Sequence, residues 1–347
     1  MSEEVVRGPA LRAEASTHLV EALRDRYGIA ARERPVDLGG SSNLNLLVAD
    51  ESMRYVVRVY RPWVTSARLA DMQLVRRKLA RGEVPCPVPT PTRDAQDAIT
   101  VDGRLVEVED YVEHDEVMDS WERLHVGLPL LGRIHTLLRP LRLSADGRRA
   151  PAANHVEAVD ALTWTTRGTK HIRQWDRVSP AELRLADISD KLAEILSDKE
   201  QRISAELPRQ IVHGDFWDNN VLFRERRVVL VTDLDFLGER PRIDDLALTL
   251  YYTNSKFSED PVSSGRIRRL RGLVDAYDSG LNEHLTKTER TALPLALART
   301  PLAFVGMIAS LDTVERARGL AAEIVPDVEW AFAITQDLEH WQDEFTT

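Results

Sequence analysis

The chain has 347 residues, of which 43% are apolar and 29% are charged, and its formal net charge is −10. This composition is ordinary for a soluble globular protein, and the acidic balance disfavours nucleic-acid binding, which depends on an excess of Lys and Arg. The single cysteine, Cys86, suits a reducing compartment, and neither a signal peptide nor a membrane span is indicated, so we expect a cytoplasmic protein.

The first part of the chain mixes helix and strand signals. A proline near the start and a glycine at the end bound an amphipathic segment, as expected for a helix. A second helix ends at a proline-rich stretch, and an Asp-Gly pair indicates a hairpin turn. The pattern predicts helices over 9–28 and 66–80, strands over 44–48 and 55–60, and a hairpin turning at Asp102 and Gly103.

Beyond residue 113 the pattern becomes mainly helical, interrupted by short β-rich runs. Ser179 and Pro180 are a typical helix start. We therefore expect an α+β chain of two lobes, with a small antiparallel sheet in residues 1–112 and a larger helical lobe in 113–347. The helices are predicted over 121–138, 155–164, 180–206 and from 243 onward, and the β-rich runs over 210–212, 221–223 and 228–231.

A short segment in the second lobe carries groups suited to metal and proton chemistry. It offers two loop carboxylates, Asp215 and Asp233, with the amide of Asn220 between them in sequence. Hard oxygen ligands of this kind suit Mg²⁺, which takes one or two protein ligands together with phosphate oxygens and water. The other carboxylate can orient a hydroxyl group and accept its proton.

The spacing of these residues resembles a known family. His213-Gly214-Asp215, followed by Asn220 and then by Asp233 and Asp235, is similar to the signature of the aminoglycoside phosphotransferase and choline kinase family. That family shares the protein-kinase-like fold, so the resemblance implies a bilobal kinase that uses ATP and Mg²⁺. It extends over most of the chain.

The resemblance implies a role for each residue of the signature. Asp215 matches the catalytic aspartate, which orients the acceptor hydroxyl and takes its proton. Asn220 and Asp233 match the ligands of Mg²⁺. Asp235 matches a second acidic position, expected to contact metal or substrate. Two further residues, His213 and Asp245, are expected to support the catalytic loop.

The first lobe carries matching features for the nucleotide. The loop with Gly40, Ser41 and Ser42 resembles the family's phosphate-covering loop, where backbone N–H groups approach an anion. Arg58 stands where most relatives have a lysine that contacts the phosphates; the charge is kept, but a forked guanidinium changes the geometry. Asp71 is the expected acidic partner of Arg58 on the following helix.

The adenine edge is expected to meet the backbone between Glu109 and Tyr111, which resembles the hinge between the lobes.

The acceptor is expected to be small, because only twelve positions separate Asp233 from Asp245. A protein kinase places a long peptide-docking segment there. A pocket between helices of the second lobe is predicted instead, with aromatic walls and nearby anions from this set: Trp164, Trp175, Tyr251, Tyr252, Trp330, Asp327, Glu329 and Asp337.

These residues favour phosphoryl transfer from ATP to a hydroxyl of an amino sugar, an aminoglycoside or another antibiotic-like compound, and the acidic charge is compatible with a cationic acceptor. An alternative acceptor is a primary metabolite such as choline, homoserine or a sugar, because function depends on the pocket rather than the fold.

A nucleotide-binding pseudokinase is a non-enzyme alternative, which the intact Asp215, Asn220 and Asp233 disfavour. A metal-dependent hydrolase is disfavoured because only one of nine histidines lies in the cluster. Monomer and homodimer, and ATP and GTP, stay open.

Overall fold

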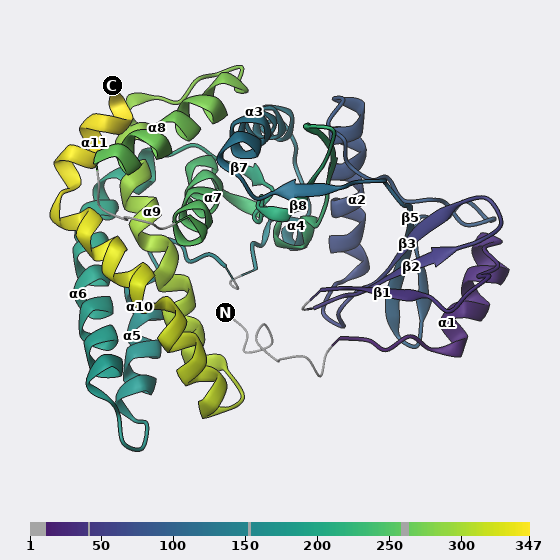
Figure 1. The fold of residues 1–347 in the computed structure, drawn as a ribbon, viewed down its shortest axis with the longest axis horizontal. Helices are drawn as coiled ribbons and strands as arrows, with labels where there is room; N and C mark the ends of the chain where they lie inside the picture. Colours follow the sequence, from purple (N-terminus) through teal and green to yellow (C-terminus); the bar gives the residue numbers. More distant parts are fainter. Residues whose placement is uncertain (1–11, 41, 152–153, 258–263) are drawn as a thin grey trace.

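The computed structural model describes residues 12–40, 42–151, 154–257 and 264–347. An antiparallel sheet forms one end of the molecule and a mass of helices forms the other, with helix α2 (Ser66–Arg81) standing between them (Figure 1). This arrangement confirms the predicted α+β architecture of a small sheet and a larger, mainly helical part. The ligand-binding residues predicted from the sequence lie where these two parts meet.

The N-terminal sheet has five strands in the order β1-β2-β3-β5-β4. Alternate residues of β2 are buried, as expected for a sheet with one face on a core. The predicted strands and hairpin are confirmed, and β1 is an additional strand that the sequence interpretation missed. The bounds are β1 (Val36–Gly39), β2 (Leu44–Ala49), β3 (Arg54–Val59), β4 (Ile99–Val101) and β5 (Arg104–Asp110).

The helix predicted over 9–28 is shorter than expected. Its described part comprises α1 (Thr17–Ala22) and the π-helical turn η3 (Leu23–Tyr27), while Pro9 lies outside the described residues. The side chain of Ser16 accepts a hydrogen bond from Leu19 N and so caps α1. Gly28 ends the segment with φ +79°, a conformation that favours glycine.

Helix α2 connects the two parts through its buried side chains. Thr65 caps its start by accepting from Arg68 N. Met72, Val75 and Leu79 pack in the hydrophobic core of the helical part, not in the separate core of the sheet. The division into lobes at residue 112 therefore stays a proposal, because α2 contributes to the core of the second lobe.

The helical part contains two small sheets among its helices. Strands β6, β8 and β9 form one, and β7 pairs with β10 in the other. The helix predicted over 155–164 is wrong in its start, since α5 begins only after Asp160. The elements are β6 (Glu116–Met118), α3 (Trp121–Leu138), α4 (Ala145–Arg148), α5 (Ala161–Arg173), α6 (Pro180–Ile203), η4 (Ser204–Glu206), β7 (Arg209–Val212), β8 (Asp218–Arg224), β9 (Arg227–Val231), η5 (Leu234–Phe236), β10 (Gly238–Pro241), α7 (Arg242–Lys256), α8 (Ser264–Ser279), α9 (Lys287–Met307), η6 (Ile308–Ser310), α10 (Val314–Gln336) and α11 (Leu338–Thr346).

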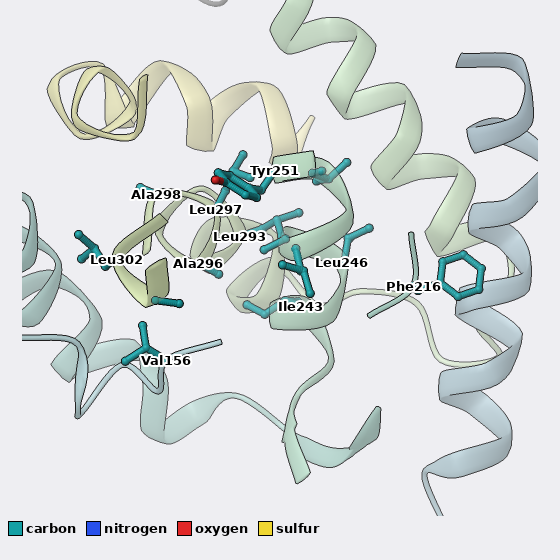
Figure 2. Packing of buried hydrophobic residues seen from close by; sticks show 14 of the residues in the cluster. Val156, Phe216, Ile243, Leu246, Tyr251, Leu293, Ala296, Leu297, Ala298 and Leu302 are labelled. Atoms are coloured by element: carbon teal, nitrogen blue, oxygen red, sulfur yellow. The ribbon is translucent and has the colours of Figure 1, made fainter. Parts of the chain in front are cut away.

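Helix α9 is the central helix of this part. By length and composition the stretch Lys287–Ser310 could cross a membrane, but 83% of its most apolar window is buried inside the fold. Figure 2 shows Leu293 and Leu297 of α9 grouped with Ile243 and Leu246 of α7. The apolar character of α9 is thus explained by its place in the core.

Candidate active site

The catalytic loop predicted from the sequence lies between β7 and β8 and is hydrogen-bonded to α7. Asp245, in the first turn of α7, accepts hydrogen bonds from the backbone N–H groups of His213 at 3.0 Å and Gly214 at 2.9 Å. Gly214 has φ +86°, and a Cβ there would lie 2.1 Å from the carbonyl oxygen of Phe236. Only glycine fits this position, which accounts for the Gly in the signature.

His213 is fully buried and contacts the backbone on both sides of the site. Its Nε2 lies 3.1 Å from the carbonyl oxygen of Thr232, and its Nδ1 accepts from Asp215 N at 3.3 Å. Burial lowers the pKa of His213 to about 4, so the ring is neutral and donates Nε2–H to Thr232. This geometry supports the expected structural role of His213.

Asp245 has a third partner that the sequence interpretation missed. Nε2 of His135, from α3, lies 3.0 Å from Asp245 Oδ2, and Nδ1 of the same ring lies 2.6 Å from the hydroxyl of Tyr277. Burial by itself would raise the pKa of Asp245, but the hydrogen bond and charge from His135 hold it below its usual range. The catalytic loop thus contacts a buried, hydrogen-bonded carboxylate, which favours the supporting role expected for Asp245.

The carboxylate of Asp215 is held by two amide side chains. Asn220 Nδ2 donates to Asp215 Oδ2 at 2.9 Å and to its backbone oxygen at 2.9 Å. Asn154 Nδ2 donates to Asp215 Oδ1 at 3.3 Å. Burial, followed by the negative charge of Asp233, raises the pKa of Asp215 to about 7. A carboxyl group with this pKa is suited to accept a proton near neutral pH.

Asp233 and Asp235 face two arginines from the other lobe. Asp233 has φ +61°, and its carboxylate lies 3.8 Å from Arg58 Nη1. Asp235 is almost fully buried, 4.0 Å from Arg58 and 3.7 Å from Arg61. Burial and the charge of Asp235 raise the pKa of Asp233, although Arg58 opposes this effect. The structure thus brings together a carboxylate pair and two cations, as a metal–phosphate site requires.

The loop before β2 reaches this carboxylate pair. Asn43 Nδ2 donates to Asp235 Oδ2, and Asn43 Oδ1 accepts from Arg61 N at 3.0 Å. Gly40 has φ +112°, and a Cβ on it would lie 2.8 Å from Asn45 Nδ2. Ser42 lies beside Asn43 at the start of β2, and Ser41 is outside the described residues. The loop is thus placed over the site, although its contact with phosphate stays a prediction.

One expectation for the first lobe needs correction. Asp71 does not contact Arg58 in the part of the chain that the structure describes: its Oδ2 accepts from the backbone N–H of Ser144 at 3.2 Å and from the Ser144 hydroxyl. Ser144 caps α4, so the carboxylate of Asp71 ties α2 to that short helix. The carboxylates facing Arg58 are those of Asp233 and Asp235.

The predicted adenine contact involves the backbone between Glu109 and Tyr111. The Glu109 carboxylate is buried and paired with Arg76 of α2, which also contacts Glu107. Tyr111 N–H donates to the carbonyl of Arg54 at 2.9 Å within the sheet. These pairings concern the Glu109 side chain and the Tyr111 N–H, and a contact of the backbone of this segment with adenine stays a prediction.

The expected aromatic walls divide into core and site residues. Trp164 is buried with its Nε1 donating to Ala303 O at 2.8 Å, and Trp330 packs edge-on against Trp341, so both belong to the core. Two other rings lie beside the catalytic loop: Trp217 and Tyr252 have centroids 5.6 Å apart. Next to them, Tyr251 donates its hydroxyl hydrogen to Asp327 at 2.7 Å.

The comparisons with known proteins agree with this site. The family model described as Phosphotransferase enzyme family (APH) matches residues 33–280. The chain belongs to this family. It is a small-molecule kinase that transfers phosphate to a hydroxyl group, and the resemblance drawn from His213 to Asp235 is confirmed.

Similar curated proteins in this phosphotransferase family are homoserine kinases. That of Gluconacetobacter diazotrophicus is 26% identical over 296 residues, covering 85% of this chain and 84% of the relative. That of Rhodopseudomonas palustris (strain HaA2) is 23% identical over 280 residues, covering 80% and 79%. Both alignments therefore span most of each protein.

Solved structures with the same fold include kinases of different acceptors. A microcompartment-associated aminopropanol kinase has a TM-score of 0.68 at 18% identity, covering 93% of this chain and 97% of that one. An amicoumacin kinase in complex with AMP-PNP and Ca²⁺ has a TM-score of 0.67 at 14% identity, covering 90% and 92%. These likenesses confirm the protein-kinase-like fold expected from the sequence.

Proposed function

We propose that this protein is an ATP- and Mg²⁺-dependent kinase of a small amino alcohol of the homoserine type. The observation that carries the proposal is the convergence of Asp215, Asn220 and Asp233 at one site, in a chain whose curated relatives are homoserine kinases. The relatives favour a primary metabolite over the antibiotic-like acceptor that the residues first suggested. We further propose that it acts in the cytoplasm, as a monomer or a homodimer.

The donor site would be formed by residues from both lobes. The donor set fits Mg²⁺: because Asn220 gives its Nδ2–H to Asp215, its Oδ1 is left as a ligand, and Asp233 adds carboxylate oxygens. Asp235 Oδ1 is buried without a protein hydrogen-bond partner among the described residues. A bound Mg²⁺ would neutralise phosphate charge, and Arg58 and Arg61 would contribute cations from the sheet.

The acceptor site would be centred on Asp215. Its carboxylate would orient the acceptor hydroxyl, and the hydroxyl proton would pass to Asp215 as the new P–O bond forms and the bond to ADP breaks. Trp217 and Tyr252 lie beside this loop, and Asp327 adds negative charge behind Tyr251. An ammonium group on the acceptor would be stabilised by such rings and by that charge.

The proposal is tested with a panel of acceptors at fixed Mg·ATP. L-homoserine, 1-amino-2-propanol, ethanolamine, choline, spectinomycin and an aminoglycoside are each supplied, and ADP formation is measured with and without acceptor. We expect an amino alcohol to give the highest kcat/KM. Turnover of spectinomycin or the aminoglycoside alone would support the antibiotic alternative, and ADP release independent of any acceptor would contradict a kinase of these compounds.

The pH dependence of kcat/KM gives a separate prediction. The proposed base acts as a carboxylate, and the pKa of Asp215 is raised to about 7, so the active form accumulates as pH rises through 7. We expect kcat/KM for the acceptor to fall as pH decreases, with a midpoint above the ordinary aspartate value; Mg²⁺ bound at Asp233 would lower this midpoint, because the charge of Asp233 contributes to the raised pKa. The rate is measured from pH 5 to 9 at saturating Mg·ATP; a midpoint at the ordinary aspartate value near 4 would contradict the assignment.

A further inference from the structure

We infer that Asn154 is a positioning residue that holds the carboxylate of Asp215 in its reactive orientation. The inference rests on the proposed role of Asp215. Asn154 is only 6% exposed and lies before α5, outside the signature from His213 to Asp235. Its Nδ2 donates to the carbonyl oxygen of Gly214 at 2.9 Å and to Asp215 Oδ1 at 3.3 Å.

The hydrogen bond from Asn154 to Asp215 Oδ1 completes a clamp on the carboxylate. Asn220 holds Oδ2 at 2.9 Å from one side, and Asn154 reaches Oδ1 from the other. An aspartate held at one oxygen can still rotate about χ2, because this torsion has broad wells. Held at both oxygens, the carboxylate has one orientation, and a fixed orientation is what in-line transfer to a hydroxyl requires. The amide nitrogen of Asn154 faces two oxygen atoms, the Gly214 carbonyl and Asp215 Oδ1, as expected for a donor to an ionised Asp215.

Asn154 is itself backed by a small polar cavity. Its Oδ1, His155 Nε2 and Asp244 Oδ2 are buried without a protein hydrogen-bond partner among the described residues. The three residues line the same cavity, of about 10 Å³, together with Arg299 and Thr300. Buried polar atoms of this kind are satisfied by a small polar molecule, and a cavity of this size takes about one water.

The charges around this cavity favour a neutral occupant over a metal ion. His155, Glu157 and Asp244 could supply ligand atoms, with His155 Nε2 3.6 Å from Asp244 Oδ2. However, Arg209 donates to both oxygens of Glu157 at 2.9 Å, and Arg299 lies 2.6 Å from Asp244 Oδ1. Because each carboxylate is already paired with a guanidinium, a divalent cation would add uncompensated charge. The cavity is therefore a polar support for Asn154.

The test compares Asn154→Ala with the isosteric Asn154→Asp. The alanine variant loses the clamp, and we expect kcat to fall about 10- to 100-fold with KM for Mg·ATP within twofold of wild type. The aspartate variant keeps the volume but replaces the donor with a negative charge. We expect a fall in kcat at least as large, because the donor to Asp215 Oδ1 is lost and a like charge is placed beside that carboxylate. The control for loss of stability is Thr169→Val in α5. It removes a buried hydroxyl that donates a hydrogen bond to Asp190 of α6 at 2.7 Å.

The outcomes separate positioning from packing. If Asn154 only fills space, Asn154→Asp retains wild-type kcat, and that result overturns the inference. A kcat loss matched by Thr169→Val at equal loss of stability also overturns it. Stoichiometric Zn²⁺ or Mn²⁺ in the purified wild-type protein, absent from His155→Ala, would replace the neutral cavity with a metal site. The acceptor used is the one that wild type phosphorylates, so failure of the proposed function appears in wild type itself and not in the ratio of variant to wild type.

Discussion

Replacing Asp215 with alanine is expected to lower kcat by about 10²- to 10⁴-fold while Mg·ATP still binds. The carboxylate is the group proposed to take the hydroxyl proton, and its hydrogen bonds come from Asn220 and Asn154 rather than from the arginines of the donor site. Arg58 and Asp233, which are proposed to hold the nucleotide and metal, stay in place in this variant. Binding of AMP-PNP by calorimetry and ADP formation are measured on the same preparation.

The control for this prediction is Asp218→Ala. Asp218 lies in the same segment, but its carboxylate is paired with Lys256 at 2.6 Å and is not directed to Asn220. We expect its kcat to stay within a few-fold of wild type. An Asp215→Ala variant with wild-type turnover would remove Asp215 from the mechanism, whereas loss of AMP-PNP binding would show that its effect is structural.

Replacing Asp245 with alanine is expected to lower the free energy of unfolding by about 3–5 kcal/mol. Asp245 is fully buried, and its removal leaves the N–H groups of His213 and Gly214 and the ring of His135 without their acceptor. Unpaired buried donors are costly because they cannot regain water. Urea denaturation followed by circular dichroism gives the change in the free energy of unfolding. We expect the kinase activity to fall as well, because the catalytic loop loses its support.

An exposed ion pair provides the comparison for Asp245. Asp187 lies 2.8 Å from Arg173, and the two side chains are 62% and 36% exposed. Asp187→Ala should cost less than about 1 kcal/mol, because water screens such pairs. If Asp245→Ala unfolds too readily to study, Asp245→Asn retains one acceptor and should show an intermediate loss. Equal stability of Asp245→Ala and Asp187→Ala would show that Asp245 does not support the loop.

Those residues of the site that lie close together in the sequence could be predicted from their spacing. Asp215, Asn220 and Asp233 lie within nineteen positions, so their type and order indicate the chemistry directly. Asn154 is sixty-one positions from Asp215, and its role arises only when the chain before α5 folds back onto the loop. Asn43 contacts Asp235 across 192 positions. Such contacts carry no periodicity or motif, although Asn43 stands in the loop already singled out for phosphate.

The surroundings of Trp164 and Asp71 differ from those predicted because they, too, depend on contacts between distant parts of the chain. Trp164 was expected in a pocket because it lies on a helix of the second lobe that was predicted to line it, but its indole N–H donates to Ala303 O inside the helical core. Asp71 was paired with Arg58 by position on α2, whereas the structure turns it toward Ser144. Amphipathic periodicity gives the buried face of a helix and not the identity of its partner.

The side chains of Arg68, Asn43 and Arg61 all contact η5 or the residue that follows it. Arg68 donates to the carbonyl oxygens of Asp235 at 2.7 Å and Leu237 at 2.9 Å, while Asn43 and Arg61 contact the Asp235 side chain. Separation of the sheet from the helical part would break the contacts of Asn43 and Arg61 with Asp235, whereas Arg68 lies on α2, which packs in the core of the helical part. The affinity for a nucleotide whose metal is bound by Asp233 and Asp235 would therefore depend on whether the two parts are together or separated. The rate of ADP release would show how readily the contacts to Asp235 break.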